Sequence, residues 1–159
     1  MTVIDNGDIV RAVGFVTIYG AYLEDRIAEL IDMIKNVISL KENITGFSAS
    51  NQVKHLLTAF KNAYNIAPDY LTKQQELEQV VSILSAVGGH LKDRHVVIHS
   101  TLISKSGGDV IIRKNRRTDT EEQVESKEVI DLANDLFDLQ SQINGLKFPI
   151  KRLVQALSK

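Results

Sequence analysis

The stretch LKDRHVVIHS, residues 91–100, contains side chains that can transfer protons and bind phosphate groups. It contains Arg94, His95 and His99, which include two of the four histidines in the chain. Cleavage of RNA through its 2′-hydroxyl needs a base for the hydroxyl proton, an acid for the leaving oxygen and a cation for the phosphorane charge. Histidine titrates in the right range for the proton transfers, and the arginine fork binds phosphate oxygens. These residue types therefore suit metal-independent phosphodiester chemistry.

A long predicted helix carries this stretch. Thr72 and Gln75 resemble a capping box at its start. Its apolar stripe, at helical spacing, is Leu77, Val80, Val81, Leu84, Gly88, Leu91, His95 and Ile98. Arg94 and His99 stand about 140° apart on an ideal helix, so we expect them to flank the stripe while His95 lies within it. Because an apolar interior resists an unpaired imidazole, we expect the helix end to meet another surface, such as a second copy.

The remaining pattern predicts a mainly α-helical bundle of four to five helices in one domain, residues 1–159. A first long helix is expected over about 8–39, and a short one over 52–64 that Ser50 or Asn51 would cap. Two β-rich runs around SGGD predict a hairpin over about 101–114. Residues 116–126 are expected to form a polar connector, and the final helix, from Ser126 onward, should end or kink at 144–149.

The first helix offers a carboxylate near the candidate site. Glu24 and Asp25 follow an aromatic-rich patch, and a carboxylate here could pair with Arg94 or tune His99, although ordinary surface acids are the simpler interpretation. Gly14 and Gly20 reduce helix propensity here, which we interpret as a close approach of another helix.

Composition limits the classes of function. The chain has 159 residues, 43% of them hydrophobic, and a net charge of −1, so contact with nucleic acid would need a local basic patch. It contains no cysteine, which excludes disulfides and thiolate chemistry and suits a cytoplasmic protein. No apolar run approaches the roughly 18 residues that span a bilayer. We therefore expect a soluble cytoplasmic protein without a membrane partner.

Further polar residues could support binding at the site. Arg113, Lys114, Arg116 and Arg117 form a basic cluster that could follow an RNA backbone or simply be a solvated loop. Ser100 could donate a hydrogen bond to a phosphate or cap the helix. His95 and His99 stand at a spacing that can hold zinc, with His90 and Asp93 nearby, but further ligands are lacking and we expect no metal or other cofactor.

The segment RHVVIH, residues 94–99, resembles the Arg-x4–6-His motif of the HEPN superfamily (higher eukaryotes and prokaryotes nucleotide-binding). In that family the residue after the arginine is a polar Asn, Asp or His, as at His95. The position near the end of a late helix, and the long first helix GFVTIYGAYLEDRIAELI, are also similar to members of this family.

The resemblance implies a homodimer whose paired motifs form a metal-independent endoribonuclease site. Arg94 would then bind the scissile phosphate, His99 would act as general acid or base, and His95 would orient the pair or touch the substrate. Apart from the resemblance, Asp93 and Glu24 are our candidates for supporting side chains. Many members of the family are toxins or phage-defence effectors encoded beside a nucleotidyltransferase-like antitoxin. Others are inactive modules that bind a protein or nucleotide partner, and this alternative stays open.

Overall fold

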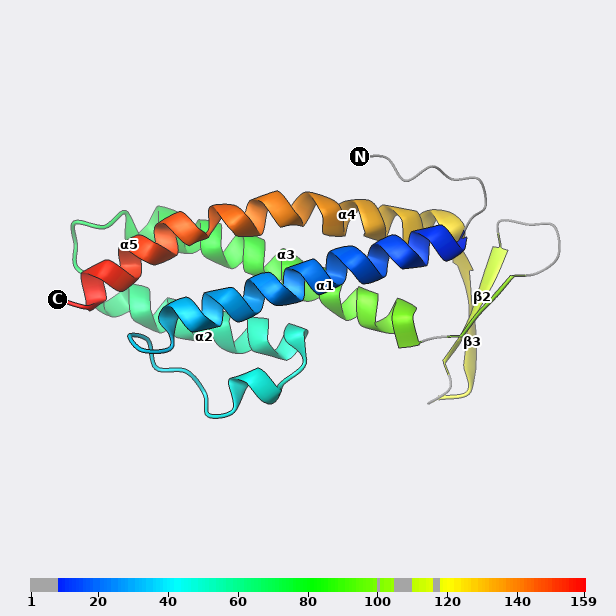
Figure 1. Cartoon of the computed structure of the whole chain (residues 1–159), viewed down its shortest axis with the longest axis horizontal. Coiled ribbons are helices and arrows are strands. Elements are labelled where there is room, and N and C mark those ends of the chain that lie inside the picture. Colours follow the sequence, from blue (N-terminus) through cyan, green and yellow to red (C-terminus); the bar gives the residue numbers. More distant parts are fainter. Residues whose placement is uncertain (1–8, 100, 105–109, 116–117) are drawn as a thin grey trace.

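The computed structural model describes residues 9–99, 101–104, 110–115 and 118–159. These residues form a mainly α-helical bundle with a small antiparallel sheet at one end (Figure 1). The helices are α1 (Ile9–Ile34), α2 (Ala49–Ile66), α3 (Lys73–His99), α4 (Ser126–Gly145) and α5 (Lys147–Leu157), and a short 3-10 helix, η1 (Ile44–Gly46), precedes α2. The predicted fold class is confirmed.

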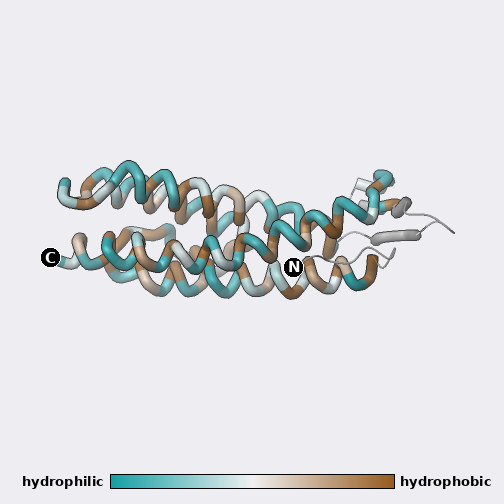
Figure 2. The backbone as a smooth tube through the Cα atoms, turned by 90° about the horizontal axis from the view of Figure 1, so that it is seen from above, coloured by the Kyte–Doolittle hydropathy of each residue, from teal (hydrophilic) through white to brown (hydrophobic). Residues whose placement is uncertain are grey.

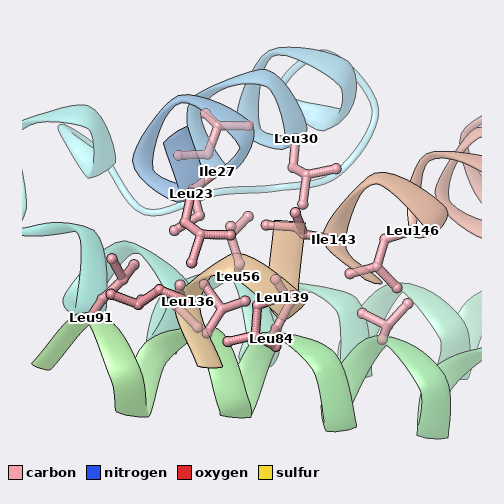
Figure 3. Close-up of a cluster of buried hydrophobic side chains, with 14 of the residues drawn as sticks. Leu23, Ile27, Leu30, Leu56, Leu84, Leu91, Leu136, Leu139, Ile143 and Leu146 are labelled. Atoms are coloured by element: carbon pink, nitrogen blue, oxygen red, sulfur yellow. The ribbon is translucent and has the colours of Figure 1, made fainter. Parts of the chain in front are cut away.

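The helices pack as two neighbouring pairs around one core. α1 lies along α4 and α2 lies along α3, while α3 also contacts both α1 and α4. Hydrophilic and hydrophobic residues alternate along each helix, as expected for amphipathic helices (Figure 2). Leucine and isoleucine side chains of four helices meet between them, among them Leu23, Leu56, Leu84 and Leu136 (Figure 3).

The boundaries of α1 and α2 differ from the predicted ones. α1 ends at Ile34 rather than near residue 39. α2 begins at Ala49, so Ser48 takes the N-cap position that we expected at Ser50 or Asn51. The Ser48 hydroxyl makes no capping hydrogen bond to the first turn of α2.

The sheet has one strand more than the predicted hairpin. β1 (Thr101–Ser104), β2 (Val110–Asn115) and β3 (Thr120–Glu125) are antiparallel in the order β1-β2-β3. The polar connector expected over 116–126 instead supplies the third strand, because residues 120–125 form β3. Cross-strand pairing of Arg113 with Glu122 and of Lys114 with Glu121 brings opposite charges together across β2 and β3.

The predicted break in the last helical segment is confirmed. α4 ends at Gly145, and α5 begins two residues later. Pro149 lies in the first turn of α5, where a missing backbone N–H costs no helical hydrogen bond. None of the helices in the described part of the chain combines the length and apolar character needed to cross a membrane.

A buried carboxylate joins three helices at the end of the bundle opposite the sheet. Glu76 of α3 is only 4% exposed. Arg152 of α5 donates to its Oε1 from Nε at 2.8 Å and from Nη2 at 2.6 Å, and the Tyr64 hydroxyl of α2 donates to Oε2 at 3.3 Å. Burial and the neighbouring Glu76 carboxylate raise the pKa of Tyr64, so its hydroxyl stays protonated and remains a donor. This cluster links α2, α3 and α5.

We predict that Arg152→Ala lowers the free energy of unfolding by about 2 kcal/mol, because the buried Glu76 carboxylate would lose its only cationic partner in the described structure. Urea denaturation followed by circular dichroism measures the change. Lys151→Ala, an exposed neighbour on α5, is the matched control and should stay within about 0.5 kcal/mol of the wild type. Equal stability of the two variants would contradict a structural role for this ion pair.

Candidate functional site

Arg94 lies on the buried face of α3. The buried residues Val80, Leu84, Val87 and Leu91 follow each other at steps of three and four, and the next position in that series is Arg94. Its side chain is 16% exposed. The predicted placement was therefore wrong in phase: Arg94 continues the buried row, whereas His95 is exposed beside it.

Helix α1 supplies the counter-charge for this arginine. Arg94 Nη1 donates to Glu24 Oε1 at 2.5 Å. The pairing that the sequence raised for Glu24 is thus present. Among the described residues this bond uses one of the five N–H donors of the guanidinium, and Nε is buried without a partner, so the donors left for a ligand are those on the Nη atoms.

Helix α1 also supplies room for the arginine side chain. A Cβ atom at position 20 would overlap Cδ and Nε of Arg94, so any larger residue there would force this side chain to move. The close approach expected at Gly20 is confirmed, and the approaching group is a side chain of α3. The same expectation was wrong at Gly14, where a Cβ would meet nothing within 4 Å.

The two histidines of the motif are exposed and adjacent. The rings of His95 and His99 lie with centroids 4.3 Å apart, as their spacing of one helical turn allows. Both side chains are accessible to solvent and therefore to a substrate. Imidazoles in this setting can accept and donate protons without first leaving a buried environment.

A cavity of about 240 Å³ lies beside this group, between the end of α3 and the start of α2. We call it the α2–α3 cavity. It is lined by Glu24, Ser48, Ala49, Ser50, Leu91, Lys92, Arg94 and His95. Arg94 and His95 thus line the same cavity.

Other predicted site residues lie on the opposite flank of α3. Asp93 and Arg113 line a separate cavity of about 430 Å³, the α3–α4 cavity. Arg113 forms an ion pair with Glu122, and Lys114 Nζ lies 3.6 Å from Asp119. Arg113 is therefore paired with a residue of β3 and Lys114 with a residue of the turn before β3, and the structure does not bring Asp93 or Arg113 together with Arg94. Ser100, Arg116 and Arg117 lie outside the described residues.

Sequence reasoning missed three polar residues of the α2–α3 cavity. They are Lys92, Ser48 and Ser50. Lys92 stands only two residues from Arg94, and its basic charge was a usable signal. The serines come from a segment more than 40 residues earlier in the chain, and no local pattern connects them to the motif.

The described residues contain no group of three or more histidine, aspartate or glutamate side chains placed to hold a metal ion. Comparison of the chain with protein-family models, with curated proteins and with solved structures found no match. The resemblance to the HEPN superfamily therefore rests on the motif, its position and the helical plan.

We predict that Gly20→Ala displaces the Arg94 side chain and lowers the free energy of unfolding by about 1–3 kcal/mol, because the new methyl group would overlap Cδ and Nε of Arg94. Gly14→Ala on the same helix is the matched control. It meets open space and should raise stability by up to about 1 kcal/mol through helix propensity. Thermal or urea unfolding measures both. A neutral Gly20→Ala would contradict the close fit of Arg94 against α1.

Proposed function

We propose that this chain is a metal-independent endoribonuclease that acts as a homodimer. The observation that carries the proposal is the grouping at the end of α3. Arg94 and His95 line one cavity, and the His99 ring contacts the His95 ring at 4.3 Å between centroids. A cationic side chain suited to phosphate and two solvent-accessible imidazoles are thus next to each other.

In this proposal the roles follow from accessibility and charge. Arg94, fixed by Glu24, binds the oxygens of the scissile phosphate with its remaining donors. His99 transfers a proton to or from the reacting oxygens, and His95 orients it through their ring contact. One His99 cannot be base and acid at once, so the second proton carrier comes from the paired chain across a two-fold axis.

The proposal includes the biological setting that the HEPN resemblance implies. The substrate is cytoplasmic RNA, and the protein acts as a toxin or a phage-defence effector. A nucleotidyltransferase-like antitoxin is the proposed protein partner. The motif, rather than the bundle, supports these assignments, because one bundle fold serves many functions.

A second candidate is an inactive HEPN-like module that binds a protein or nucleotide partner. The Arg94–Glu24 ion pair favours this candidate. The ion pair and the packing of the Arg94 side chain against Gly20 give Arg94 a structural role without any catalysis. The two candidates differ in whether the wild-type protein cuts RNA at all.

We predict that the protein cuts a mixed RNA substrate in the presence of EDTA. His99→Ala should reduce the rate by about 10²–10⁴-fold because the proton carrier is lost. Arg94→Ala should reduce it by a similar factor through lost phosphate stabilisation. Gel analysis of labelled RNA over time measures the rates, and circular dichroism and size-exclusion chromatography check fold and dimer.

The matched control is His90→Ala, which removes a histidine from the same helix but from the α3–α4 cavity. It should keep the wild-type rate. Cutting that survives both His99→Ala and Arg94→Ala would place the activity elsewhere. A pure wild-type protein that cuts no RNA would overturn the proposed activity in favour of the binding module.

A further inference from the structure

The α2–α3 cavity extends away from His99 toward the first turn of α2. His99 does not line it, whereas Ser48, Ala49 and Ser50 do. A substrate phosphate placed between Arg94 and His99 would therefore leave this end of the cavity empty. The residues around that end show which group could occupy it.

The basic side chains at this cavity come from α3. Lys92 is exposed on the wall of the cavity, next to His95, and Arg94 forms the wall toward α1. The one acid among the lining residues is Glu24, whose carboxylate is already bound by Arg94. The charge available to a ligand is thus positive, in a chain whose net charge is −1.

Hydrogen-bond donors face these cations from the other side. The first backbone N–H groups of an α-helix have no acceptor within the helix, and α2 begins at Ala49. Ser48 makes no capping bond to them, and its hydroxyl lies 3.5 Å from that of Ser50. Hydroxyls and backbone amides at the start of an 18-residue helix favour an anion with several acceptor oxygens.

We propose that the α2–α3 cavity binds a second phosphate group, held between Lys92 and His95 on α3 and the Ser48–Ser50 turn at the start of α2. Within the proposed function, on which this assignment to RNA rests, it is a phosphate next to the scissile one. It fixes the strand so that the scissile phosphate lies at Arg94 and His99. Binding of the phosphate itself does not depend on cleavage.

Titration of inorganic phosphate and of pyrophosphate into ¹⁵N-labelled protein at constant ionic strength tests this directly. We expect saturable shifts of the Ala49, Ser50 and Asn51 amide signals together with those of residues 92–95. Lys92→Glu should weaken the binding by about tenfold or more, since it reverses a charge at the cavity wall. The matched control, Lys61→Glu, changes the same charge at an exposed position farther along α2 and should bind like the wild type.

The outcomes separate this inference from the nuclease proposal. Phosphate binding without RNA cleavage would support the phosphate site and overturn the nuclease. RNA cleavage without shifts of the amide signals at the start of α2 would support the nuclease and overturn the phosphate site. Equal weakening by Lys92→Glu and Lys61→Glu, or shifts centred on Arg113 and Lys114, would overturn the phosphate site as non-specific attraction to basic side chains.

Discussion

An arginine on the buried face of a helix needs a counter-charge and room for its side chain, and α1 supplies both to Arg94. Glu24 provides the carboxylate at 2.5 Å, and Gly20 leaves the space in which Cδ and Nε of Arg94 lie. The two lie one helical turn apart on the same side of α1. This arrangement fixes how α1 and α3 lie against each other near the end of α3. Arg94 rather than His95 continues the buried row of α3, and His95 and His99 are exposed.

The two flanks of α3 differ in charge. The α2–α3 cavity has Lys92, Arg94 and His95 against one acid, Glu24. The α3–α4 cavity instead carries four acids and two basic residues, which are Asp93, Glu128, Asp131, Asp135, His90 and Arg113. A polyanion approaching a nearly neutral chain would therefore be attracted to one flank and repelled by the other. The asymmetry agrees with placing both the proposed reaction and the second phosphate on the α2 side.

Helical periodicity was enough to predict most of the bundle, because the buried face of a helix repeats at steps of three and four. Periodicity gave the wrong assignment where charged or polar residues stand at positions that the pattern expects to be apolar. Arg94 was assigned to the flank of the stripe because helical spacing placed His95 within it, although a pairing of Arg94 with a carboxylate of the first helix, 70 residues away, was one interpretation. β3 was missed for a similar reason: its exposed residues are polar, and of its six residues only Val124 is buried. Contacts across helices and strands decide both cases, and a single sequence does not display them.

The chemical form of the cut RNA ends tests most directly the claim that Arg94 and His99 act on a phosphate attacked by the 2′-hydroxyl. Mass spectrometry of the products formed in EDTA should find 2′,3′-cyclic phosphate, or the 3′-phosphate that it hydrolyses to, together with 5′-hydroxyl ends. Replacement of the ribose at the cut position by 2′-deoxyribose should abolish that cut. Products with 3′-hydroxyl and 5′-phosphate ends would contradict the account, since water rather than the 2′-hydroxyl would then be the nucleophile.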